Sequence, residues 1–160
     1  MAKQHEQKTN AMRVLDAAGI PYEYRFFETD GPKSGVEVAE MLGLDPEGVF
    51  KTLVTVGHSK DHYVFMIPVA EELDLKKAAK AVGEKSIQMI KSKELLPLTG
   101  YVHGGCSPIG MRKLFVTTVD ETAQLFDAIT FSGGRIGCQI VMDPADLEKV
   151  VPLAYADLTV

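Results

Sequence analysis

The chain has 160 residues, of which 46% are hydrophobic and 24% are charged, and its formal net charge is −5 at pH 7. These values predict one globular domain, residues 1–160, and argue against a protein that coats DNA through its overall charge. No apolar run approaches the ~20 residues that cross a bilayer, and the polar residues 1–8 do not resemble a signal peptide. Cys106 and Cys138 are too few for a disulfide framework, so we expect a reducing, cytoplasmic location.

The first half of the sequence alternates helix and strand patterns with clear end signals. The predicted elements are, in chain order, a helix from Thr9 to Gly19, a strand over 22–27, a helix between Ser34 and Gly43, a strand over 49–56, a hairpin loop over 57–62 and a returning strand over 63–69. In the first helix, Met12, Leu15 and Ala18 are expected to face inward. Ser34 and Glu37 have the spacing of a capping box, which predicts where the second helix begins.

The second half predicts short helices and clustered strands. These elements are, in chain order, a helix over 75–82 closed by Gly83, a helical turn over 92–96 ended by Pro97, a strand over 114–119, a turn over 120–123, strands over 128–131 and 136–142, a helix capped by Asp143 and Pro144, and a strand over 150–154. Because the strands cluster instead of alternating with long helices, we predict the α+β class, with a mixed β-sheet curled toward a barrel and flanked by short helices.

The stretch from Thr99 to Gly110 is the most unusual part of the chain, with four glycines, one proline, one histidine and one cysteine in twelve residues. Glycine lets a ligand approach the main chain closely, and Ser107-Pro108 is a turn signal. Two interpretations stay open, a long structural turn and a loop that presents backbone N–H groups to a ligand. A second glycine-rich turn, Ser132–Arg135, is either an ordinary hairpin turn or part of a cleft wall.

Lys51 stands out because it lies inside a predicted strand that is apolar on both faces. Period-two alternation places it on the same face as Val49 and Leu53. A buried unpaired charge is costly, so this lysine must reach water, a partner or an anionic ligand. It is therefore either a cation that faces a phosphate or carboxylate, or a lysine that reaches solvent from a strand edge.

The charge is unevenly distributed along the chain. Residues 74–93 hold six lysines against two acidic residues, whereas residues 114–160 hold two basic residues against seven acidic ones. The basic segment is compatible with a local polyanion site, and equally with a solvated lysine-rich helix.

Five segments resemble the YbaK family, also called the EbsC family, within the prolyl-tRNA synthetase editing-domain superfamily. In chain order they are Lys8–Arg13, Val49–Leu53, Leu73–Lys80, Thr99–Met111 and Ser132–Gly137. The resemblance implies a curved, barrel-like mixed sheet and a trans-editing deacylase of mischarged aminoacyl-tRNA. The expected substrate is Cys-tRNA(Pro), with Cys-tRNA(Cys) as a further candidate, and no metal or cofactor is expected.

The resemblance also implies the site residues. Catalytic roles fall on Lys51, Gly104 and Gly105. Substrate binding falls on Phe27, Thr52, Gly100, Tyr101, Cys106, Ser107, Pro108, Ser132, Gly133 and Gln139. Some family members carry an aspartate where this chain has Gln139, and a tyrosine where it has Phe26-Phe27, which leaves the amino-acid preference open.

The mechanism implied by the resemblance uses the thiol of the cysteine substrate, which attacks its own carbonyl and releases a thiolactone. The protein then supplies orientation and electrostatic stabilisation: backbone N–H groups of residues 100–107 for the oxyanion, and Lys51 for the terminal phosphate or ribose. The expected partners are the aminoacyl-tRNA acceptor end and prolyl-tRNA synthetase, without DNA or membrane. The alternatives are a deacylase for another small amino acid such as alanine, and a non-catalytic module that binds tRNA or the synthetase.

Overall fold

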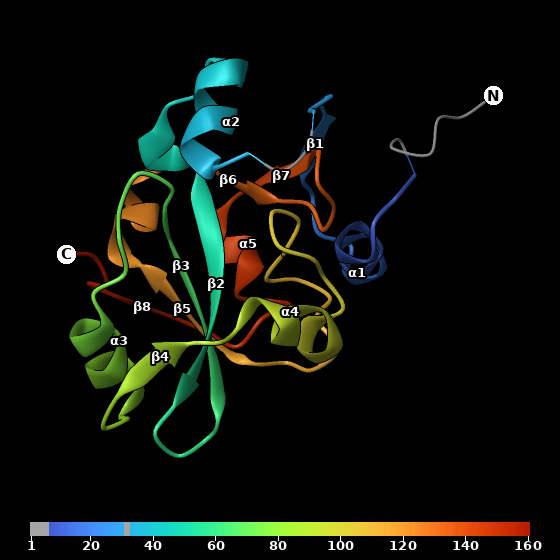
Figure 1. The fold of residues 1–160 in the computed structure, drawn as a ribbon. Coiled ribbons are helices and arrows are strands. Elements are labelled where there is room, and N and C mark those ends of the chain that lie inside the picture. Colours follow the sequence, from blue (N-terminus) through green and yellow to red (C-terminus); the bar gives the residue numbers. More distant parts are fainter. Residues whose placement is uncertain (1–6, 31–32) are drawn as a thin grey trace.

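The computed structural model describes residues 7–30 and 33–160 (Figure 1). The helices are α1 (Asn10–Ala18), α2 (Gly35–Leu42), α3 (Leu75–Val82), α4 (Ser92–Thr99) and α5 (Pro144–Leu147), with short 3₁₀ helices η2 (Pro46–Gly48) and η3 (Glu121–Leu125). The strands are β1 (Glu23–Phe26), β2 (Phe50–Gly57), β3 (His62–Pro68), β4 (Ile87–Met89), β5 (Val116–Asp120), β6 (Ile129–Ser132), β7 (Cys138–Met142) and β8 (Leu153–Ala156). The predicted polar N-terminal stretch lies mostly outside the described residues. Over the described ranges, no helix is long and apolar enough to cross a membrane.

The strands are divided between two sheets. The three-stranded sheet has the order β1-β7-β6 and is antiparallel, while the five-stranded sheet has the order β4-β2-β3-β5-β8 and is mixed, because β5 pairs in parallel with β3 and β8. A parallel bridge between Val49 and Thr130 joins the two sheets at the start of β2. The predicted α+β class, with a mixed sheet and short flanking helices, is confirmed.

The helix ends follow the capping signals in the sequence. The backbone N–H of Met12 donates to Oγ1 of Thr9 (3.2 Å), which begins α1. Ser34 and Glu37 form both hydrogen bonds of the predicted capping box at the start of α2 (3.1 and 3.0 Å). Gly83 ends α3 with φ +74°, a conformation that favours glycine. Local side-chain chemistry therefore determines these boundaries.

The main core lies where α1 packs with residues of both sheets. Its largest fully buried members include Met12, Leu15, Phe50, Met66, Ile109, Ile129, Phe131 and Ile140. A second cluster packs α3 against β3 through Ala78, Ala79, Phe65 and Ile67. Phe50 of β2 belongs to the main core and Leu53 packs against the second cluster, so that residues at the start of β2 occupy a rigid position next to the three-stranded sheet.

Several predicted details were wrong. Ala18 is exposed, so only Met12 and Leu15 of the three expected positions are buried. Pro97 does not end α4, which continues to Thr99. The missing proline N–H removes only one helical hydrogen bond, and Oγ1 of Thr99 donates to the Leu95 carbonyl (2.7 Å) in the last turn. The last strand begins at Leu153, because the N–H groups of residues 150 and 151 both donate to the Leu147 carbonyl in the turn that ends α5.

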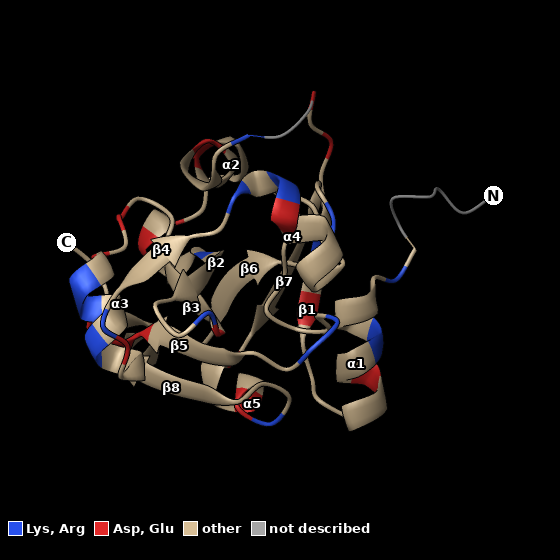
Figure 2. Ribbon diagram, turned by 60° about the horizontal axis from the view of Figure 1, so that its bottom comes forward, with Lys and Arg blue, Asp and Glu red and all other residues tan. Residues whose placement is uncertain are grey.

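The lysine-rich segment forms α3 and the connections on either side of β4. In Figure 2, the ribbon of α3 is largely coloured as Lys or Arg and lies beside the C-terminal end of the chain. Nζ of Lys77 donates to Asp157 (2.9 Å) and to the Thr159 carbonyl (2.7 Å). The basic middle and the acidic C-terminal third of the sequence therefore partly neutralise each other in the fold.

Candidate functional site

A cleft of about 530 Å³ is lined by residues of both sheets, α2, the β4–α4 segment and the glycine-rich loop. Its lining consists of Phe27, Lys33, Ser34, Gly35, Val38, Val49, Phe50, Lys51, Thr52, Leu53, Val54, Val69, Met89, Ile90, Ser92, Leu95, His103, Gly104, Cys106, Phe131, Ser132, Gly137, Cys138 and Gln139. Among the described residues, this lining includes Lys33, Lys51 and His103 and no Asp or Glu. The cleft is thus suited to an anionic ligand, although the whole chain is acidic.

Lys51 extends from β2, the strand whose first residues lie between the two sheets. Its backbone pairs with Ile67 of β3. The side chain is half-buried, and burial lowers its pKa, while Glu72 and Glu71 oppose this shift from a distance. Within the described ranges, Nζ of Lys51 makes no ion pair or hydrogen bond. A partly desolvated cation that has no partner and no neighbouring carboxylate in the described part of the cleft is a binding group for a phosphate or a developing oxyanion.

The glycine-rich loop presents backbone donors at the same cleft. Gly104 lines it in a left-handed conformation, with φ +85°. The N–H of Gly105 donates to the Val102 carbonyl (3.0 Å). Among the described residues, the N–H groups of His103, Gly104 and Cys106 have no acceptor. Such unpaired donors can stabilise negative charge on a substrate oxygen.

The two glycine-rich segments pack directly against each other. A Cβ at Gly105 would lie 2.8 Å from the Ile136 nitrogen and 2.9 Å from the Arg135 carbonyl carbon, so only glycine fits there. A Cβ at Gly133 would lie 2.5 Å from Sγ of Cys138. Because most of these contacts are to backbone atoms, the two loops fix each other's position and together form one wall of the cleft.

The comparison with known families identifies this arrangement. Residues 30–150 match the model of the family described as the aminoacyl-tRNA editing domain. The chain belongs to this family. Over 98% of its length it is 45% identical to a protein of Enterococcus faecalis named as a candidate Cys-tRNA(Pro)/Cys-tRNA(Cys) deacylase, EbsC, of which it covers 96%.

Two further relatives place the editing domain in a wider context. A proline–tRNA ligase of Thermodesulfovibrio yellowstonii shares 32% sequence identity with a segment of this chain. The matched segment covers 57% of this chain and 16% of the ligase. The crystal structure of a candidate trans-editing enzyme for prolyl-tRNA synthetase superposes with a TM-score of 0.83 at 24% identity, covering 97% of this chain and 99% of that one. At this identity, the second likeness shows the fold alone.

The structure brings seven of the predicted site residues of the editing domain to the cleft. They come from four different parts of the sequence and comprise Phe27, Lys51, Thr52, Gly104, Cys106, Ser132 and Gln139. Gln139 and Ser132 are neighbours across the β6–β7 pair, and Nη1 of Arg25 in β1 donates to Oε1 of Gln139 (2.8 Å). Lys51 and Thr52 line the same cleft from β2.

The other predicted site residues do not line the cleft. They are Gly100, Tyr101, Gly105, Ser107, Pro108 and Gly133. The buried hydroxyl of Tyr101 donates to the Ile109 carbonyl (2.6 Å), and Oγ of Ser107 accepts from the Ile109 N–H (3.2 Å). Gly100 ends α4 with φ +87°. Their contacts hold the glycine-rich loop in shape.

Both cysteines line the cleft as neutral thiols. Burial raises the pKa of Cys106 to about 12, with a small opposing effect of the Thr99 hydroxyl. Burial also raises the pKa of Cys138 to about 11, although Arg135 lies near enough to oppose it. Because the thiolate is the nucleophilic form, neither side chain is suited to attack a substrate carbonyl. The described residues also contain no cluster of three His, Cys, Asp or Glu side chains that could hold a metal ion.

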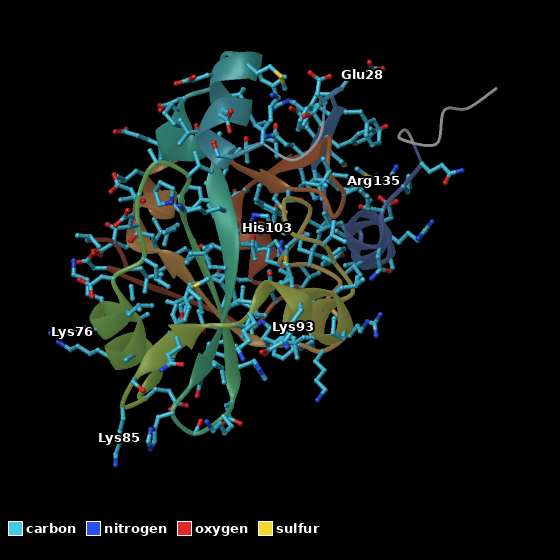
Figure 3. All side chains as sticks on the ribbon, in the orientation of Figure 1. Glu28, Lys76, Lys85, Lys93, His103 and Arg135 are labelled. Carbon is cyan, nitrogen blue, oxygen red and sulfur yellow. The ribbon has the colours of Figure 1, made fainter. Side chains whose placement is uncertain are left out.

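Sequence reasoning missed two basic lining residues, Lys33 and His103. Figure 3 shows His103 near the middle of the molecule, whereas Lys76 and Lys85 point away from it. His103 is exposed at the cleft, in the same loop as Gly104. Its place within the glycine-rich loop was the available signal, while Lys33 lies in an irregular segment without a pattern. The lysine-rich helix α3 contributes no residue to the cleft.

Proposed function

We propose that this chain removes the amino acid from mischarged tRNA, with Cys-tRNA(Pro) as its main substrate and Cys-tRNA(Cys) as a further one. The observation that carries the proposal is Lys51, a cation without a partner among the described residues, in a cleft whose described lining holds no carboxylate. The 3′ end of a tRNA brings a phosphate and an aminoacyl ester to such a cleft. The similarity to EbsC over nearly the whole chain supports the same substrate class.

The roles divide between the strand and the loop. Lys51 orients the terminal phosphate or ribose through its charge, which burial makes more effective than in water. The unpaired N–H groups of His103, Gly104 and Cys106 stabilise the oxyanion that develops on the ester carbonyl. Gly105 holds this loop against the Arg135–Ile136 backbone, so the donors are fixed before the substrate binds.

The nucleophile is supplied by the substrate. The cysteine sulfur attacks its own ester carbonyl, a carbon–sulfur bond forms, and the ester carbon–oxygen bond breaks. The proton of the thiol passes to the departing ribose oxygen, so the products are a cysteine thiolactone and tRNA with a free hydroxyl. The raised pKa values of Cys106 and Cys138 favour this route, because the chain's own thiols are protonated at neutral pH.

The partner of this reaction in the cytoplasm is the acceptor end of aminoacyl-tRNA, with prolyl-tRNA synthetase as a docking partner that selects the tRNA. A cleft of about 530 Å³ holds a terminal aminoacyl-nucleotide and little more of the tRNA. The isolated protein is therefore expected to deacylate Cys-tRNA(Pro) and Cys-tRNA(Cys) at similar rates. A strong preference for one of them without the synthetase would contradict this division of labour.

The experiment that tests the proposed function is deacylation of Cys-tRNA(Pro), Ala-tRNA(Pro) and Pro-tRNA(Pro) by the purified protein. Selective loss of cysteine is the expected result. Loss of alanine instead would require an activated water and would replace the proposed substrate. If none of the three is deacylated while the protein still binds tRNA, the chain is a non-catalytic module.

A further inference from the structure

The outer edge of strand β2 is uncovered where it lines the cleft. β4 pairs with β2 only at Thr55–Gly57, and beyond this pairing the Ile90 N–H donates to the Val54 carbonyl (3.4 Å). At the other end, the three-stranded sheet reaches this region through the bridge at Val49. The segment between these two contacts contributes Phe50 to Leu53 to the cleft lining. A short open strand edge therefore lies inside the cleft.

The register of the β2–β3 pair shows which backbone groups point to this open edge. The Val69 N–H donates to the Val49 carbonyl (2.9 Å), and the Gly57 N–H donates to the Asp61 carbonyl (2.8 Å). In an antiparallel pair such residues alternate, so the odd-numbered residues of β2 bond to β3. The backbone N–H and C=O of Thr52 consequently point away from β3, toward the cleft.

The Thr52 side chain adds a third polar group at the same position. Its Oγ1 is shielded from bulk water and has no hydrogen-bond partner in the part of the chain that is described. Buried polar atoms in folded proteins are normally paired. Thr55, three residues further along the same strand, follows this rule, because its Oγ1 donates to the Tyr63 carbonyl (2.8 Å). Thr52 is thus the exception, and it lines the cleft.

Two side-chain acceptors on the wall formed by β6 and β7 already accept a hydrogen bond. Oε1 of Gln139 accepts from Arg25, and Oγ of Ser132 accepts from the Gly134 N–H (3.2 Å). Lys51 and the glycine-rich loop provide donors. A ligand that carries both an anion and an ammonium group therefore finds donors at Lys51 and the loop, and free acceptors at Thr52.

We propose that Thr52 binds the α-amino group of the aminoacyl ester through its carbonyl oxygen and Oγ1, and so positions the substrate carbonyl against the glycine-rich loop. This inference rests on the proposed deacylase function. It assigns recognition of the α-amino group to a strand edge, in a cleft whose described lining has no carboxylate for this purpose. A substrate with a blocked or missing α-amino group should therefore be deacylated more slowly than Cys-tRNA(Pro).

The test compares Cys-tRNA(Pro) with 3-mercaptopropionyl-tRNA(Pro), which keeps the thiol and the ester but lacks the α-amino group. Thr52→Val removes the hydroxyl and preserves the shape of the side chain. It should lower kcat/KM for Cys-tRNA(Pro) about 10-fold, the usual effect of one lost hydrogen bond to a charged group, and leave the mercaptopropionyl substrate unaffected. Thr52→Ser should restore the wild-type rate.

The matched control is Thr55→Val, which changes the same residue type in the same strand outside the cleft. It should leave the ratio of the kcat/KM values for the two substrates unchanged. Equal effects of Thr52→Val on both substrates, or no effect on either, would overturn the inference while leaving the deacylase function intact. A wild-type protein that deacylates neither substrate would overturn both.

A measurement on the wild-type protein covers the case in which Thr52→Val does not fold. Each enzymatic rate is divided by the spontaneous hydrolysis rate of the same ester, which removes the effect of the amino group on ester reactivity. The inference expects the corrected kcat/KM to be at least about 10-fold lower without the α-amino group. Equal corrected rates would overturn it.

Discussion

Lysines occur in two regions of this molecule, the cleft and the surface of α3, and their surroundings differ. Lys51 is half-buried at the cleft, without an ion-pair partner in the described structure, and burial lowers its pKa. Lys77 on α3 is partly exposed and donates to Asp157 and the Thr159 carbonyl, and the hydrogen bond to Asp157 raises its pKa. The charge of Lys77 on the lysine-rich helix is thus paired within the protein. Lys51 is the better candidate for binding the substrate, because no described side chain neutralises its charge.

The largest effect is expected from Lys51→Ala. Removal of the only basic side chain that β2 contributes to the cleft should lower kcat/KM for Cys-tRNA(Pro) about 100-fold or more, the usual result when a preorganised electrostatic contact is lost. Thermal stability should not fall, because the substitution removes a partly desolvated charge. Lys77→Ala is the matched control and should retain wild-type activity. Near-normal deacylation by Lys51→Ala would remove this residue from the mechanism.

The next effect contrasts two glycines. Gly105→Ala places a methyl group against the Arg135–Ile136 backbone and should destabilise the fold by about 1–3 kcal/mol, with loss of deacylation. Gly83→Ala at the end of α3 meets no atom within 4 Å and should cost about 1–2 kcal/mol through its positive φ alone, without affecting activity. Urea unfolding and deacylation assays separate the two. Full activity in a folded Gly105→Ala variant would show that the contact between the loops is dispensable.

A smaller effect distinguishes the two lysines by the sign of their pH dependence. Between the lowered pKa of Lys51 and its ordinary value of 10.5, the unfolded chain holds more protons at this residue than the folded chain does. The stability of wild type relative to Lys51→Met should therefore rise with pH across this window. The contribution of Lys77 to folding stability is present below pH 10.5 and is lost as pH rises through its raised pKa. The stability of wild type relative to Lys77→Met should therefore fall as pH rises. Urea unfolding from neutral pH to above 10.5 measures both trends, and trends of the same sign would contradict the contrast.

The smallest effect is expected on the exposed face of α3. Lys76 and Lys80 are exposed, make no ion pair among the described residues and contribute nothing to the cleft. Their replacement by Ala should change deacylation by less than about two-fold. A large loss of activity at low salt that disappears at high salt would instead show that this surface contacts the tRNA.

Much of the local structure could be predicted because local chemistry determines it. Thr9, the Ser34–Glu37 capping box and Gly83 mark helix ends through side-chain caps or a left-handed backbone, which depend on few neighbouring residues. Pro97 misled because a single missing hydrogen bond is tolerated in a helix whose end is secured by Thr99 and Gly100. β4 was not predicted, since three residues are too short for a period-two pattern.

The candidate site was predictable in its residue types more than in its geometry. The strand pattern singled out Lys51, and the structure places it in the cleft. No local pattern could show that Gly105 packs against Arg135, or that β4 leaves the β2 edge open beside Thr52, because both depend on contacts between distant segments. Tyr101 and Ser107 belong to the predicted loop, yet their hydroxyl groups bond within it.

The most direct test of the account is deacylation of S-methylcysteinyl-tRNA(Pro) beside Cys-tRNA(Pro). The methyl group blocks the thiol and leaves the α-amino group, the ester and the tRNA unchanged. Because the described lining of the cleft holds neutral cysteines and no carboxylate, we predict rapid release of cysteine and no release of S-methylcysteine above the spontaneous rate. Release of both at comparable rates would mean that an activated water attacks the ester, and would contradict catalysis by the substrate thiol.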